Sequence, residues 1–126
     1  MNPIKLTYLV AVAQLEAVTA EYNKSDAAFD VDFEAAGEPE DFKAFHAAWS
    51  DVNPARAANA QRLCTLQNEA RAVLTKAENA LLDWCVEKVR PIAKSQAALD
   101  DVLAVRNCKL VSIRRKAIEL ALRLDG

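Results

Sequence analysis

Residues 54–92 read PARAANAQRLCTLQNEARAVLTKAENALLDWCVEKVRPI. Apolar side chains recur through them at heptad spacing, and Leu74 and Leu81 widen the stripe that the others form: Leu63, Leu66, Ala70, Val73, Ala77, Ala80 and Trp84. A stripe that persists over three heptads is typical of a helix packed lengthwise on another long helix. The stretch therefore predicts one long helix with a long helical neighbour.

Four prolines divide the chain, at Asn2-Pro3, Glu38-Pro39, Asn53-Pro54 and Arg90-Pro91. Proline suits the first position of a helix, and asparagine suits the N-cap before it, so Asn2 and Asn53 are predicted caps. These proline positions predict four helical segments. The first begins at residue 3 and ends near residue 24 or continues through 28, and an acidic connection follows over residues 26–41. The others cover about 39–51, 54–89, and 91 or 95 to 124.

The last segment carries a second apolar stripe, formed by Leu99, Leu103, Leu110, Ile113, Ala117, Leu120 and Leu124. Pro91 is either a tight turn between two antiparallel helices or a kink in one helix of roughly 70 residues. The turn is favoured because short helix connections are common in bundles. The expected fold is all-α. It is a helical bundle in one domain over 1–126, built on a long antiparallel hairpin (about 54–89 and 92–124) covered by an N-terminal helix and a short second helix.

The composition argues against most catalytic sites. The chain has 126 residues, two glycines and one histidine. Two glycines cannot build a P-loop or a dinucleotide-binding loop, and a lone His46 cannot form a histidine metal cluster. The run Asp30-Val-Asp32-Phe-Glu34 resembles a calcium loop but places an alanine where the turn needs glycine. We expect no enzymatic activity, no metal and no cofactor.

Compartment signals favour the cytoplasm. Charged residues interrupt the apolar first segment too often for a membrane span. Cleavage after the Ala11-Val12-Ala13 run would leave a signal peptide shorter than the roughly 15–30 residues expected. Three cysteines, at positions 64, 85 and 108, form no CxxC pair and are expected to be free thiols in a reducing compartment. We expect a cytoplasmic protein without membrane contact.

All four phenylalanines, at positions 29, 33, 42 and 45, lie in or beside the acidic stretch, and Trp49 follows them. Phe42, Phe45 and Trp49 are spaced i, i+3, i+7 and share one helix face. Such a stripe serves either as a set of anchors for a partner's groove or as the contact of a short helix with its own bundle.

Charge is divided between the two ends of the chain. Residues 1–52 hold ten acidic and three basic residues, whereas residues 53–126 hold eight acidic and thirteen basic residues. The basic candidates are Arg106, Lys109, Arg114, Arg115 and Lys116. Three interpretations stay open: a solvated helix face, a face that contacts nucleic-acid phosphates, and a basic half that complements the acidic half within or between chains.

These observations predict a non-enzymatic interaction or scaffold protein that acts by helix packing with a protein partner. The apolar stripe of the last helix covers more than half its circumference, which favours a homodimer. The candidate interaction residues are Phe42, Phe45, Trp49, Leu110, Ile113 and Leu120. One alternative is a nucleic-acid-associated protein that uses Arg106, Lys109, Arg114, Arg115 and Lys116. A further alternative is a bundle that binds a small apolar ligand in an alanine-lined gap.

Overall fold

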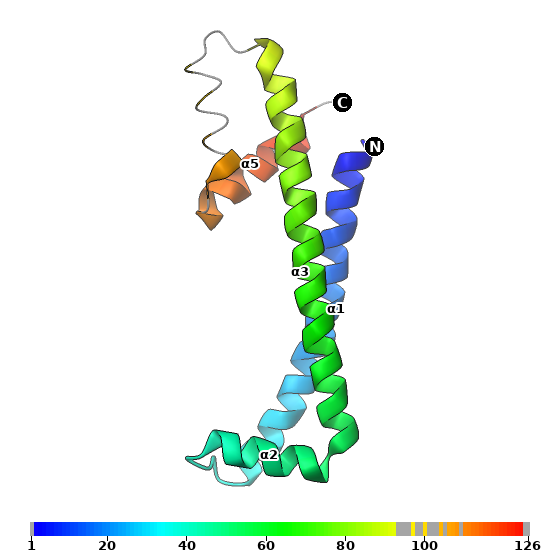
Figure 1. Ribbon diagram of the computed structural model, residues 1–126, viewed down its shortest axis with the longest axis vertical. Helices are drawn as coiled ribbons and strands as arrows, with labels where there is room; N and C mark the ends of the chain where they lie inside the picture. The colour runs from blue at the N-terminus through cyan, green and yellow to red at the C-terminus, as the bar shows by residue number, and fades with distance from the viewer. Residues whose placement is uncertain are drawn as a thin grey trace. The chain divides into compact units, whose positions relative to one another are not determined.

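The computed structural model describes residues 2–92, 97, 100, 104, 106–108 and 110–124. These residues form the helices α1 (Pro3–Ala35), α2 (Phe42–Val52), α3 (Pro54–Val89) and α5 (Val111–Arg123), with a 3-10 turn at Arg90–Ile92 (Figure 1). No strand occurs among them. The prediction of an all-α fold is confirmed.

The chain divides into two compact units. The central unit is residues 13–71, and the terminal unit combines residues 1–12 with 72–126. In the central unit, the side chain of Gln67 on α3 donates a hydrogen bond of 3.1 Å to Thr19 on α1. In the terminal unit, Ile4 and Tyr8 of α1 pack against the core cluster that α3 and α5 form, and Ile4 lines a hollow together with Ala77 and Ala80 of α3. Within each unit α1 and α3 are thus antiparallel neighbours, and α1 is the long partner that the heptad stripe requires.

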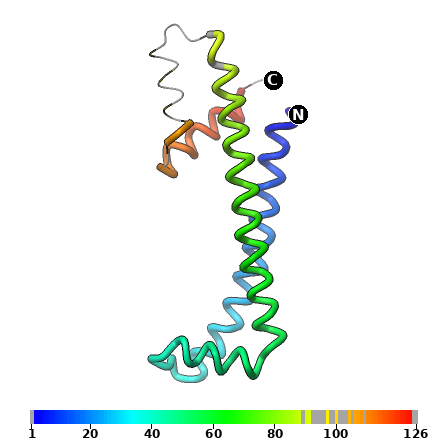
Figure 2. The backbone as a smooth tube through the Cα atoms, in the orientation of Figure 1, coloured from blue at the N-terminus to red at the C-terminus, as the bar shows by residue number. Residues whose placement is uncertain are grey.

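The position of α5 beside α3 answers the question raised by Pro91 (Figure 2). Arg106 contacts Asp83 and Arg114 contacts Asn79, so the chain returns beside α3, and a single kinked helix is excluded. The predicted lengthwise pairing of 92–124 with α3 is not what the described residues show. Helix α5 crosses α3 instead, and its end reaches α1, where Lys5 Nζ donates to the carbonyl of Leu124.

The core of the terminal unit lies where α5 crosses α3. Its buried members are Leu81, Leu82, Ile118 and Ala121, and Leu81 and Ala121 are 0% exposed. Removing a leucine side chain from water contributes roughly 1.5–3 kcal/mol, so these few contacts hold α5 in place. Whether both units form the single domain predicted over 1–126 stays a prediction.

Of the two predicted asparagine caps, one is confirmed and one is wrong. Asn2 Oδ1 accepts the backbone N–H of Ile4 at 2.8 Å and caps α1 as expected. Asn53 instead ends α2, because its backbone N–H and its Nδ2 both donate to the carbonyl of Trp49, at 2.8 and 3.0 Å. The junction before Pro54 is so short that Asn53 serves both helices: its side chain and N–H close α2, while its carbonyl accepts the N–H of Ala57 at 3.0 Å and opens α3.

The first helix is longer than the sequence suggested, and Pro39 opens no helix. Helix α1 continues to Ala35 and closes with two backbone bonds, from Gly37 to Glu34 at 3.0 Å and from Glu38 to Phe33 at 3.1 Å. This pair is a Schellman motif, in which Gly37 takes the left-handed conformation at φ 82°. Proline commonly follows such an ending because it cannot continue the helix.

Helix α2 begins after that turn, at Phe42 rather than near residue 39. Its cap is Asp41, whose Oδ1 accepts the backbone N–H of Ala44 at 3.0 Å. A carboxylate at this position satisfies an unpaired N–H and complements the helix dipole. The predicted acidic connection is therefore confined to the few residues between α1 and α2, and the rest of it is helical.

Candidate protein-interaction site

The predicted aromatic anchors of α2 lie against α1 in the central unit. We call the six-ring cluster that they form there the aromatic corner: Phe29, Phe33, Phe42, Phe45, His46 and Trp49. The rings of Trp49 and Phe29 meet edge to face with centroids 5.0 Å apart, and both side chains are only 8% exposed. Phe42 is 51% exposed and Phe45 is half-buried. Of the three predicted anchors, Phe42 alone offers much surface to a partner.

A polar contact that the sequence did not predict joins Asp32, Trp49 and Arg56 at the edge of the aromatic corner. Asp32 accepts a hydrogen bond from the indole N–H of Trp49 at 2.9 Å and another from Arg56 at 3.0 Å. The Arg56 guanidinium also lies over the indole ring, 5.1 Å from its centroid. The hydrogen bond from Trp49, and then the hydrogen bond and charge of Arg56, lower the pKa of the Asp32 carboxyl. Asp32 of the Asp30-Val-Asp32 run therefore makes a structural contact here.

The lowered pKa of Asp32 predicts an acid-sensitive corner. A group whose pKa is lower in the folded state stabilises the fold above its unfolded pKa, and that contribution disappears as the pH falls through the folded pKa. We expect the loss below about pH 4, given an ordinary aspartate pKa near 3.9. Carbon-13 NMR titration of the Asp32 carboxyl measures it directly. The Trp49→Phe variant should raise the pKa of Asp32, and an unchanged value would contradict the assigned cause.

Two of the predicted phosphate-binding arginines are occupied within the terminal unit. Arg106 binds both carboxylate oxygens of Asp83, at 2.7 and 3.4 Å, and this hydrogen bonding raises the pKa of Arg106. Arg114 is largely buried and binds Asn79 at 3.0 Å and Glu78 at 3.6 Å. Its guanidinium also donates to the carbonyls of Arg106 and Cys108. Both arginines thus fix the chain that leads into α5.

The other predicted cations are placed differently. Arg115 and Lys116 are exposed on α5, and Lys109 lies outside the described residues. Arg115 lines a hollow beside Tyr8 and Glu78, whereas Lys116 borders a second hollow on another side of α5. The five predicted phosphate contacts are therefore not brought together as one surface by the described part of the chain.

A groove of about 560 Å³ lies between α3 and α5 in the terminal unit, and we call it the α5 groove. Its apolar lining comes from both helices: Leu82, Cys85, Val86, Ile113, Ala117, Leu120 and Leu124. Three cationic side chains also line it: Arg106, Lys116 and Arg123. A volume of this size lies within the roughly 300–1,000 Å³ of known ligand pockets.

Two of the three predicted α5 contact residues line this groove. Ile113 and Leu120 do so and are 37% and 59% exposed. Leu110 precedes α5, is 62% exposed and does not line the groove. The sequence analysis did not predict Cys85 and Val86 as contact residues, because the heptad stripe contains their neighbour Trp84 instead. Their spacing of i, i+3 and i, i+4 from Leu82 is the signal that would have found them.

The cysteine thiols and the potential metal ligands are the remaining candidate reactive groups among the described residues. The three cysteines are free and half-buried, and burial raises the pKa of the Cys85 thiol, which lowers its thiolate fraction. No three histidine, cysteine, aspartate or glutamate side chains among the described residues gather as a metal site. None of the described helices combines the length and apolarity needed to cross a bilayer.

Comparison with protein-family models, with curated proteins and with solved structures found no match to this chain. Function must therefore be inferred from the two surfaces themselves. The aromatic corner is mostly closed by its own rings, whereas the α5 groove is open and bordered by exposed leucine.

Proposed function

We propose that this chain is a non-enzymatic interaction protein that binds a protein partner through the α5 groove. The observation that supports the proposal is the combination of an apolar groove of about 560 Å³ with exposed apolar residues along it. Ile113 and Leu120 line the groove seven residues apart on one face of α5, and they are 37% and 59% exposed. Exposed apolar surface along a groove is typical of an interaction site. A groove between two helices is the shape that receives an amphipathic helix.

Site-specific cross-linking tests this proposal in the host cell. A photoreactive amino acid in place of Leu120 should yield discrete adducts with a partner, because that side chain lines the groove and is 59% exposed. The matched control places the same probe at Val31, which is 65% exposed in the central unit. We expect no adducts at Val31 and at least a tenfold loss at position 120 when Ile113→Asp is added. Equal labelling at both positions would contradict the proposal.

A homodimer is the second part of the proposal. Leu110 and Val111 are 62% and 70% exposed, lie outside the lining of the α5 groove and would supply the contact between copies. A dimer at tens of micromolar is the expected result, and a monomer would contradict this part of the proposal. Light scattering measures this directly.

Nucleic-acid binding receives less support from the described residues. Arg106 and Arg114 are engaged by Asp83, Glu78 and Asn79, which removes two of the five cations from a phosphate-binding surface. The remaining described candidates, Arg115 and Lys116, border different hollows. The protein-interaction proposal is therefore preferred.

A further inference from the structure

We infer that the occupant of the α5 groove is an acidic amphipathic helix of a partner protein. The inference rests on the proposed function and adds the chemistry of the partner. Three observations support it: the charge of the terminal unit, the charges along the groove, and the spacing of those charges on α5.

The two units differ in the sign of their charge. By sequence, the terminal unit holds eleven basic and seven acidic residues, a net charge of +4. The central unit holds five basic and eleven acidic residues, a net charge of −6, and the two sum to the −2 of the whole chain. An acidic partner is therefore attracted to the unit that carries the groove.

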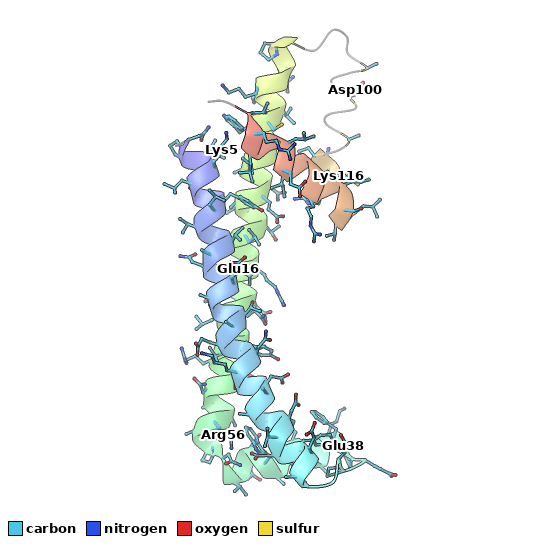
Figure 3. All side chains as sticks on the ribbon, turned by 180° about the vertical axis from the view of Figure 1, so that it is seen from behind. Lys5, Glu16, Glu38, Arg56, Asp100 and Lys116 are labelled. Atoms are coloured by element: carbon cyan, nitrogen blue, oxygen red, sulfur yellow. The ribbon has the colours of Figure 1, made fainter. Side chains whose placement is uncertain are left out.

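The charged residues that line the groove also favour an acidic partner. Arg106, Lys116 and Arg123 line it together with apolar residues, and no carboxylate of a described residue does. Arg106 is already held by Asp83. Within the described residues, Lys116 and Arg123 form no salt bridge, and Lys116 projects from α5 with an exposed side chain (Figure 3). These two cations are left to meet the charges of an occupant.

The spacing of the two cations indicates an extended occupant. Lys116 and Arg123 are seven residues apart on α5, which places them on one face and about 10 Å apart along the axis. A helix with carboxylates at i and i+7 presents charges at the same separation, with apolar side chains between them for the groove lining. A fatty-acid-like ligand carries one carboxylate and can meet only one of the two cations.

A second copy of this chain is the less suitable occupant. Its own α5 would bring the same Lys116 and Arg123 to the contact, so that like charges would meet across a symmetric interface. The helix that fits best carries the opposite charge beside its apolar face. The inference therefore favours a different protein over self-association at this groove.

Three synthetic helical peptides of equal length test the inference with the full chain. Each has leucines at i, i+3, i+4 and i+7, and two variable positions seven residues apart beside that stripe. These positions hold glutamate, glutamine or lysine. Fluorescence anisotropy of the labelled peptides gives the dissociation constants. At low salt we expect the glutamate peptide to bind about fivefold more tightly than the glutamine peptide, and the lysine peptide to bind most weakly.

Variants of the chain assign the effect to the groove. Lys116→Gln with Arg123→Gln should remove the preference for glutamate over glutamine, while the matched control Arg115→Gln, which alters a cation outside the groove, should keep it. Half-molar salt should reduce the preference in the unaltered chain. Helicity measured by circular dichroism checks that each variant is folded.

The possible outcomes separate the inference from the proposed function. Equal binding of the glutamate and glutamine peptides, both lost in Leu120→Asp, would overturn the acidic partner and keep the groove as a docking site. No binding of any peptide would overturn both. Light scattering that shows peptide binding coupled to dissociation of a dimer would identify a second copy as the occupant and overturn the inference.

Discussion

Replacing Leu81 with alanine should destabilise the terminal unit by about 3 kcal/mol. The side chain is 0% exposed and lies in the core cluster with Leu82, Ile118 and Ala121. Its removal loses the burial of the side chain and leaves a cavity where α5 crosses α3, since a close-packed interior relaxes only in part. The α5 groove begins at the next residue, Leu82, so the same change should also weaken peptide binding.

Each unit contains one of the two tryptophans of the chain, which allows a local measurement. Urea unfolding followed by Trp84 fluorescence in a Trp49→Phe background reports on the terminal unit. The matched control is Val73→Ala on the same helix, where the side chain is 49% exposed and we expect a loss below about 1 kcal/mol. Equal losses for the two variants would contradict the assigned core. Coincident transitions of Trp84 in this background and of Trp49 in a Trp84→Phe background would support one cooperative domain.

Replacing Trp49 with alanine should destabilise the central unit by about 3 kcal/mol or more. The indole is 8% exposed, meets Phe29 edge to face and donates to Asp32. The change removes a large buried ring and leaves the Asp32 carboxylate with Arg56 as its remaining donor. The end of α1 and the start of α3 both lose a contact, so the whole corner is expected to loosen.

Two further variants separate the contributions of Trp49. Trp49→Phe keeps an aromatic ring but loses the indole donor, so its loss should be clearly smaller than that of Trp49→Ala. The matched control is Phe42→Ala, because Phe42 belongs to the same cluster but is 51% exposed. Urea unfolding monitored by circular dichroism compares all three. A loss in Phe42→Ala equal to that in Trp49→Ala would show that burial does not set the order.

Much of the fold could be predicted from the sequence because proline positions and apolar periodicity are local signals. The cap at Asn2 and the start of α3 at Pro54 were predicted from these local signals. The partner of α3 could not be chosen, since two segments carried apolar stripes and periodicity does not say which of them lies alongside. The start of the second helix was wrongly predicted at Pro39, because proline is common both at the first position of a helix and just after a helix ends.

The candidate site was predicted only in part. Ile113 and Leu120 were found from the spacing of apolar residues on the last helix. Arg114 was predicted to be an exposed cation, but the fold half-buries it against Glu78 and Asn79, which are 35 or more residues away in sequence. The pairing of Trp49 with Asp32 likewise depends on the turn between α1 and α2. Such contacts are set by tertiary packing, which a local pattern does not encode.

The most direct test of the groove as the functional site is an amide chemical-shift titration of the full chain with the glutamate peptide. We predict that the shifts concentrate on Leu82 and Val86 of α3 and on Ile113 and Leu120 of α5, and that Phe42 in the aromatic corner is unaffected. Shifts centred on the aromatic corner, or none at saturating peptide, would contradict the account.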